Sequence, residues 1–338
     1  MDILNALERY AGRPAVSGAE TSFRHLLQED LSATGLRLEF RGHSLVVFPE
    51  HPDPDAPLLL THLDEPGLVI SSVEDRGFLR FRPVGEIAGA DLANQEVLVG
   101  PRELPGVIGL RPPHILSEKE RHEGVQPQEL FIDLGMEDAR DLVRVGDCAV
   151  VRRRTYAVGA TRYLGRALGD KAGVAALATL VQRRGKALRC PVAFCAGHHA
   201  GFRGAAEVAE ALAPRRAVVV DALPARSFQD PSPLLELGKG PGLVTGPLVD
   251  RSFTAELEAR GADARILLRR LPLAERRVTD AWTVQIAAGG VALGLLALPV
   301  RYPGSFGELV DLEDLRRIFL LLEALDCGKG AESCCCRN

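Results

Sequence analysis

The sequence predicts an α/β protein: a mainly parallel sheet flanked by helices, with a small β-rich domain inserted into it. Three observations lead to this prediction. After residue 164, helical and strand-like segments alternate along the chain. Residues 57–60 form an apolar run that ends in polar residues, as a buried strand does. Residues 67–163 hold only short apolar runs separated by glycine, proline and charged residues, which is typical of a β-rich module.

The first 66 residues predict two helices followed by strands. Apolar residues recur with helical spacing in residues 4–10 and again in residues 23–31. Between these segments, Ser17 and Glu20 have the spacing of a capping box, which predicts a helix start. Residues 36–48 alternate in hydrophobicity on either side of an Arg-Gly-His turn, as a pair of strands does.

The second half of the chain predicts the rest of the same α/β domain. Helices are expected at residues 171–184, 205–212 and 311–325, and strands at 191–196, 217–221 and 291–300. We therefore divide the chain into a discontinuous α/β domain, an inserted β-rich domain and a flexible tail, with the bounds 1–66 plus 164–327, 67–163 and 328–338. The tail contains Cys334, Cys335 and Cys336, which bind a soft metal, carry redox chemistry or are incidental thiols.

Composition excludes several classes of function. The 338 residues are 46% hydrophobic and 25% charged, with a formal net charge of −4, so neither a nucleic acid nor a membrane surface is an expected partner. No apolar run approaches the roughly 18 residues that span a bilayer. The N-terminal residues lack the basic and apolar regions of a signal peptide. We expect a cytoplasmic protein.

Polar residues gather where the predicted strands end, which is where α/β sheets place their functional groups. Histidine and aspartate from several strand ends suit a hydrolytic metal site. Asp64 lies two residues after His62, a spacing at which its carboxylate can accept the second N–H of the imidazole. A histidine with a purely structural role also fits this spacing. The polar residues at these ends, together with the start of the following helix, are His62, Asp64, Asp170, His198, His199 and Asp221.

The order of several motifs is similar to metallopeptidase family 42, which contains the glutamyl and tetrahedral aminopeptidases. THLDEPG at residues 61–67 resembles the Ala-His-Met-Asp-Glu-x-Gly of that family. The match extends from about residue 6 to about residue 325. It implies a zinc-aminopeptidase-like phosphorylase/hydrolase fold whose inserted domain serves dimerisation. The other matching motifs are GVIG at 106–109, FIDLG at 131–135, RVGD at 144–147, GFRGA at 201–205, LGKGP at 237–241 and TDA at 279–281.

The resemblance implies a centre that keeps only some of the family's metal ligands. In that family a bridging aspartate, two histidines, a glutamate and a second aspartate hold two metal ions, and a further glutamate is the general base. His62 and Asp221 match two of the ligands, and Asp64 matches the residue that orients the histidine. Gly169 stands at the bridging aspartate and Gly304 at the last histidine.

The two glutamates of the family are also replaced. His198 stands at the general base and His199 at the glutamate ligand. Two dications need a shared anionic bridge and further carboxylates to offset their repulsion, so a paired-metal site is not expected. Asp170 and Trp282 are expected to line the pocket beside Gly169 and Gly304.

Two hypotheses follow for the function, and they leave open whether the chain is an enzyme. The first is a homologue without ordinary aminopeptidase activity or a cofactor, which acts through binding or assembly. The second is a hydrolase of peptide-like or amide substrates that uses His198 or one divalent metal, with zinc as the first expectation, held by His62, His199 and Asp221. The resemblance also implies a homo-oligomer, from a dimer to a twelve-subunit shell, or a mixed oligomer with an active relative. A peptide or amino acid is the expected ligand.

Overall fold

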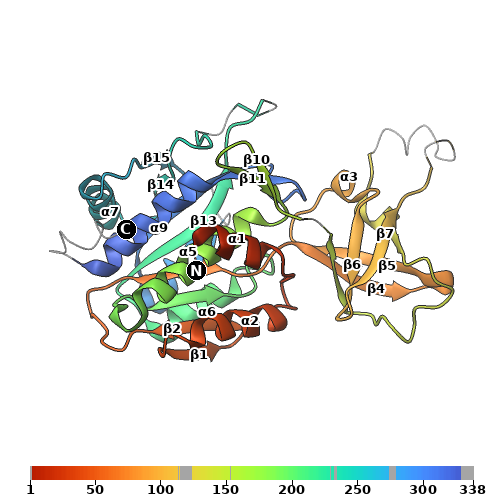
Figure 1. Cartoon of the computed structure of the whole chain (residues 1–338), viewed down its shortest axis with the longest axis horizontal. Helices are drawn as coiled ribbons and strands as arrows, with labels where there is room; N and C mark the ends of the chain where they lie inside the picture. Colours follow the sequence, from red (N-terminus) through yellow and green to blue (C-terminus); the bar gives the residue numbers. More distant parts are fainter. Residues whose placement is uncertain are drawn as a thin grey trace.

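The chain forms two bodies of unequal size, a large α/β body and a small β barrel beside it (Figure 1). The computed structural model describes residues 2–112, 114, 124–152, 154–228, 230–231, 234–273 and 279–328. The barrel comes from the middle of the sequence, so the α/β body takes its residues from both sides of it. Cys334, Cys335 and Cys336 lie outside the described residues.

An eleven-stranded sheet forms the centre of the α/β body. Its strands are β1 (Arg37–Arg41), β2 (Ser44–Phe48), β3 (Leu58–His62), β10 (Tyr156–Val158), β11 (Arg162–Gly165), β12 (Val192–Cys195), β13 (Arg216–Pro224), β14 (Gly242–Thr245), β15 (Arg269–Pro272), β16 (Ala292–Arg301) and β17 (Glu308–Asp311). Their order is β1-β2-β12-β3-β13-β16-β17-β11-β10, and β14 pairs with β15 and β16.

The prediction of a mainly parallel sheet is correct only for the centre of this sheet. Strands β12, β3, β13 and β16 pair in parallel with one another. The flanking pairs β1–β2, β2–β12, β16–β17, β17–β11 and β11–β10 are antiparallel. The sheet is therefore mixed, because antiparallel strands, among them the β1–β2 and β10–β11 hairpins, extend the parallel centre on both sides.

Helices cover both faces of the sheet, as the alternation of segments predicted. They are α1 (Ile3–Ala11), α2 (Thr21–Ser32), α5 (Leu168–Arg184), α6 (Arg203–Leu212), α7 (Arg251–Asp263), α8 (Ala281–Val284) and α9 (Leu312–Cys327). Side chains of α1, α2, α5, α7 and α9 belong to one hydrophobic cluster, and those of α6 and α8 belong to another. Within the described part of the chain, no helix is both long and apolar enough to cross a membrane.

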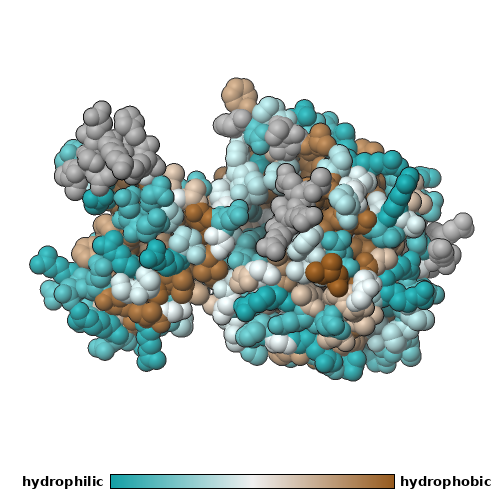
Figure 2. Space-filling view, turned by 180° about the vertical axis from the view of Figure 1, so that it is seen from behind, coloured by the Kyte–Doolittle hydropathy of each residue, from teal (hydrophilic) through white to brown (hydrophobic). Residues whose placement is uncertain are grey.

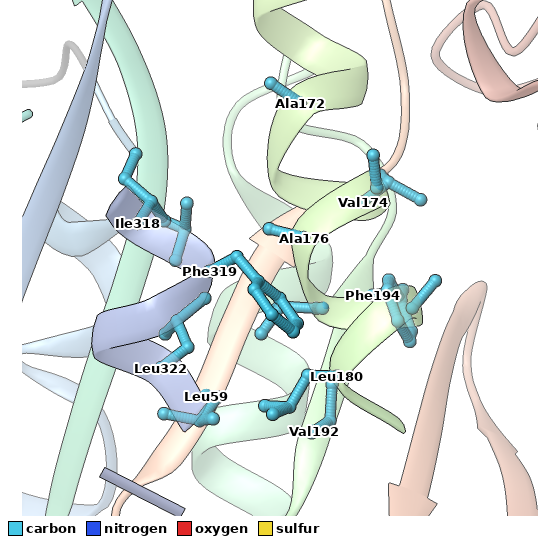
Figure 3. Packing of buried hydrophobic residues seen from close by; sticks show 14 of the residues in the cluster. Leu59, Ala172, Val174, Ala176, Leu180, Val192, Phe194, Ile318, Phe319 and Leu322 are labelled. Atoms are coloured by element: carbon cyan, nitrogen blue, oxygen red, sulfur yellow. The ribbon is translucent and has the colours of Figure 1, made fainter. Parts of the chain in front are cut away.

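Helix α5 packs closely against the parallel strands and so fixes the edge of the sheet where the polar residues gather. A Cβ at Gly173 would collide with the hydroxyl of Thr61 and would lie 2.9 Å from its Cβ, so only glycine allows this approach. On its other side α5 contacts α9, and Figure 3 shows Phe319 of α9 pointing toward Ala176 and Leu180 of α5. The middle of α5 is therefore packed tightly between the sheet and α9.

The inserted body is a closed barrel with its own hydrophobic core. Its strands follow the order β4-β5-β8-β7-β6-β9, and the short helix α3 (Gly89–Leu92) lies after β5. The predicted insert of residues 67–163 also includes β10 and β11, but these strands pair within the large sheet. The barrel therefore ends at residue 151. Its strands are β4 (Gly67–Val73), β5 (Phe78–Val84), β6 (Glu96–Val99), β7 (Leu104–Gly109), β8 (Phe131–Asp133) and β9 (Cys148–Val151).

Candidate metal centre

Four segments of the α/β body meet where its parallel strands end. His62 is the last residue of β3, and Asp221 lies in the neighbouring strand β13. His198 and His199 follow β12, and Asp170 lies in the first turn of α5. The structure therefore brings these five residues together, as their positions in the sequence suggested.

The ring of His62 is oriented by a hydrogen bond to the backbone. Its Nδ1 lies 3.0 Å from the carbonyl oxygen of Asp64, and because a carbonyl only accepts, Nδ1 donates. The other nitrogen, Nε2, faces Asp221 Oδ1 at 3.4 Å and Asp170 Oδ1 at 3.8 Å. Burial lowers the pKa of His62, but these two carboxylates outweigh it and raise that pKa. The position in front of Nε2 therefore attracts a cation, either a proton or a metal ion.

The carboxylate of Asp64 holds the backbone of the two neighbouring histidines, which differs from the predicted contact with the ring of His62. It lies 3.9 Å from His62 Nδ1, which is too far for a hydrogen bond. Instead it accepts the backbone N–H groups of His198 and His199 at 3.1 and 3.2 Å and the hydroxyl of Ser17. Burial opposes ionisation of Asp64, but the histidines and Ser17 outweigh it and lower its pKa.

Ser17 does not cap a helix, contrary to its spacing in the sequence. Helix α2 begins at Thr21 with Glu20 as its N-cap residue, and no side chain accepts a hydrogen bond there. The hydroxyl of Ser17 is directed to Asp64 instead. The segment around Ser17 thus helps to hold the carboxylate of Asp64 in place.

Asp170 lies between His62 and His199. Its Oδ1 is 3.5 Å from His199 Nε2, and the ring planes of His62 and His199 are nearly perpendicular, at 89°. Burial opposes ionisation of Asp170, but His199 and His62 outweigh it and lower its pKa. A carboxylate is therefore present between the two imidazoles, although the preceding residue, Gly169, has no side chain.

His198 is paired with an aspartate that the sequence did not single out as part of the site. Its Nδ1 lies 3.1 Å from Oδ2 of Asp280, whose side chain is 1% exposed. Burial lowers the pKa of His198, but Asp280 outweighs burial and raises that pKa to about 9. The ring of His198 also stacks on that of His62, with centroids 3.9 Å apart and an interplanar angle of 22°. In the metal-free protein the pairing with Asp280 therefore favours the protonated form of His198.

Two groups of three residues are close enough to hold a metal ion, and both include His62. One consists of His62, Asp170 and His199, and the other of His62, His198 and Asp221, with ligand atoms within 4.8 Å of one another. Among the described residues, the predicted set of His62, His199 and Asp221 does not meet this distance as one group. These three are instead divided between the two groups.

The geometry of the rings favours the first group. Stacked, nearly parallel imidazoles direct their lone pairs side by side, so those of His62 and His198 do not converge on one ion. Ligands about 2.1 Å from a tetrahedral ion lie about 3.4 Å from one another. In the first group, Asp170 Oδ1 lies 3.5 Å from His199 Nε2 and 3.8 Å from His62 Nε2, close to this spacing.

Two buried atoms at the centre have no hydrogen-bond partner, namely Nε2 of His199 and Oδ2 of Asp221. The 3.5 Å between His199 Nε2 and Asp170 is long for a hydrogen bond. Unsatisfied buried polar atoms are rare and commonly indicate an ion or water. The donor set therefore fits one divalent ion held by His62, Asp170 and His199, with Asp221 beside it.

The other half of the centre has no side-chain ligand at Gly169 or Gly304. The buried carboxyl of Glu308 accepts the backbone N–H of both glycines. Burial, together with the charge of Asp170, raises the pKa of Glu308 to about 8. Trp282 is half-buried in α8 and packs against the hydrophobic cluster beneath α6 and α8.

The chain is similar in sequence and in structure to known aminopeptidases. Residues 43–321 match the family model described as M42 glutamyl aminopeptidase. The lysyl aminopeptidase of Pyrococcus furiosus is 26% identical, over 79% of this chain and 80% of that protein. An aminopeptidase of the archaeon Desulfurococcus kamchatkensis has a structure with a TM-score of 0.85 and 27% identity, covering 96% of this chain and 94% of that chain. The Pyrococcus horikoshii TET1 peptidase can assemble into a tetrahedron or a large octahedral shell. Its structure has a TM-score of 0.85 and 27% sequence identity, covering 96% of this chain and 99% of that chain.

Proposed function

The chain belongs to the M42 glutamyl aminopeptidase family, and on that premise we propose that it is a hydrolase of peptide-like or amide bonds that uses one divalent metal ion. The proposal excludes ordinary two-metal aminopeptidase activity. Gly169 and Gly304 provide no ligands for a second ion, and His198 stands where the family has a glutamate base. His62, Asp170 and His199 would hold the single ion.

One observation carries this proposal. The hydrogen bond from His62 Nδ1 to the carbonyl of Asp64 directs Nε2 toward two ionised carboxylates, Asp170 and Asp221. Buried carboxylates in front of a lone pair repel it unless a cation lies between them. Nε2 of His199 also lacks a partner; a proton on His62 would leave it unsatisfied, whereas an ion would take it as a ligand.

The residues around the proposed ion include one group placed for proton transfer, His198. A divalent ion in this centre would polarise the carbonyl of a bound substrate as a Lewis acid. Asp280 accepts a hydrogen bond from Nδ1 of His198, so Nε2 is the nitrogen left to exchange a proton with substrate or water. We propose that Nε2 of His198 takes the proton of the attacking water and then passes it to the leaving amine, as a general base and then a general acid.

Binding or assembly without catalysis is the second candidate function. The absence of a carboxylate base and of two metal ligands favours it. The TET1 relative assembles into shells, and Figure 2 shows hydrophobic residues on one face of the inserted barrel. Exposed apolar residues of this barrel include Val107 and Val145. We propose a homo-oligomer, and the inserted barrel is the domain we expect to form its contacts.

Hydrolysis assays separate the two candidates. The wild-type chain is incubated with aminoacyl, peptide and amide substrates in the presence of Zn²⁺, Co²⁺ or Mn²⁺. The proposal predicts turnover that His62→Ala abolishes and that His43→Ala, a change at an exposed histidine outside the centre, leaves intact. Metal-bound protein that turns over none of these substrates would favour the binding function. Two ions per chain with fast aminopeptidase turnover would contradict both candidates.

A further inference from the structure

The carboxyl of Glu308 joins the two loops that lack metal ligands. Glu308 is the first residue of β17, and its side chain is 3% exposed. Its Oε2 accepts the backbone N–H of Gly169 at 2.8 Å, and its Oε1 accepts that of Gly304 at 2.9 Å. One carboxyl therefore holds two backbone segments that are far apart in the sequence.

Little space remains around Gly169 beside this contact. A Cβ at Gly169 would lie 2.9 Å from the Cβ of Ala222, 3.3 Å from Val300 Cγ2 and 3.4 Å from Glu308 Oε2. The cavity that remains beside Glu308 and Gly304 measures about 10 Å³, which is room for about one water molecule. The carboxyl of Glu308 thus lies between Gly169 and Gly304, with little open space beside it.

The contact with Gly169 also fixes Asp170, the next residue. The carboxylate of Asp170 reaches His62 and His199 from a backbone that starts at Ala167, whose φ of 53° is left-handed. Such a conformation costs on the order of 1–3 kcal/mol in a residue other than glycine, so surrounding contacts must maintain it. The hydrogen bond from Gly169 to Glu308 is one such contact, and it lies directly beside the ligand.

We propose that Glu308 is a positioning residue for the metal centre: it holds the amides of Gly169 and Gly304 and thereby fixes Asp170 between His62 and His199. This inference rests on the proposed one-metal function. Glu308 acts through Asp170 and is not itself a ligand, because both of its oxygens accept backbone N–H groups. Residues that orient metal ligands commonly change metal affinity by about 10–100-fold when replaced.

Glu308→Gln tests this role without changing the volume of the side chain. The comparison is made above about pH 8, where Glu308 is ionised and both of its oxygens accept. A glutamine has one acceptor oxygen, so its NH₂ would face one of the two backbone N–H groups and that contact would be lost. The control is Glu323→Gln, a change at another buried carboxyl, which pairs with Arg183 away from the centre. Co²⁺ is the probe: its affinity is measured by chelator competition, its coordination by the visible absorption spectrum, and backbone protection by hydrogen exchange.

We expect Glu308→Gln to bind Co²⁺ about 10-fold or more weakly, with an altered spectrum and faster exchange at Gly169 and Gly304. Glu323→Gln should keep the wild-type affinity and spectrum even if it lowers thermal stability. A Glu308→Gln protein with wild-type affinity and spectrum would overturn the positioning role but leave the one-metal proposal standing. A wild-type protein that binds no Co²⁺ would overturn both.

Discussion

Replacing Asp64 with alanine removes the acceptor of the buried Ser17 hydroxyl and of the partly buried N–H groups of His198 and His199. A buried donor left without a partner costs about 1–3 kcal/mol. The Ser17 hydroxyl can rotate to another acceptor, so we count the two backbone donors alone. Because these two donors are only partly buried, Asp64→Ala should lower the free energy of unfolding by about 2 kcal/mol, out of the 5–15 kcal/mol typical of folded proteins.

Urea unfolding of the metal-free protein measures this loss. Asp64→Asn keeps one acceptor oxygen and should lose about half as much stability. Asp250→Ala is the comparison, because Asp250 accepts one N–H, from Phe253 at the start of α7, and such a cap contributes about 1 kcal/mol. If Asp64→Ala lowers the free energy of unfolding no more than Asp250→Ala does, the Asp64 carboxylate does not hold the backbone of the two histidines.

Three further predictions concern the packing, the ionisation and the missing half of the centre. Gly173→Ala should destabilise the fold by about 1–3 kcal/mol in thermal unfolding, because its Cβ would collide with Thr61; unchanged stability would contradict the close packing of α5. His198 has a raised pKa, so its pairing with Asp280 should stabilise the metal-free protein fully below about pH 6.5, and this stability should be lost as the pH rises through about 9. Unfolding measured from pH 6 to 10 should show this loss in the wild type but not in Asp280→Asn; identical pH dependence would refute the pairing. Gly169→Asp should not raise the metal content above about one ion per chain in elemental analysis, because Ala222 and Val300 block the new side chain, and a second bound ion would show that this space opens.

The sequence predicted the central strands and helices of the fold because their patterns are local. The apolar run before His62 and the helical spacing after Asp170 were sufficient to predict β3 and α5. The polar residues that follow buried strands identified His62, His198, His199 and Asp221, since the ends of parallel strands share one edge of the sheet.

The remaining features depend on contacts between distant segments, which periodicity does not record. His198 meets Asp280, 82 residues further along, and Glu308 meets Gly169 across 139 positions. The His-x-Asp spacing suggested a contact between the Asp64 carboxylate and the His62 ring, but two backbone N–H groups and Ser17 occupy that carboxylate instead. Likewise, nothing local in residues 156–165 distinguishes the β10–β11 hairpin of the large sheet from the barrel strands before it.

The metal content of the wild-type chain tests the central claim most directly. Protein purified without chelators is dialysed against trace Zn²⁺ and subjected to elemental analysis, alongside His62→Ala and His43→Ala. The one-metal centre predicts about one ion per chain in the wild type and in His43→Ala, and none in His62→Ala. Wild-type protein that retains no ion, or that retains two, would contradict a centre built on His62, Asp170 and His199.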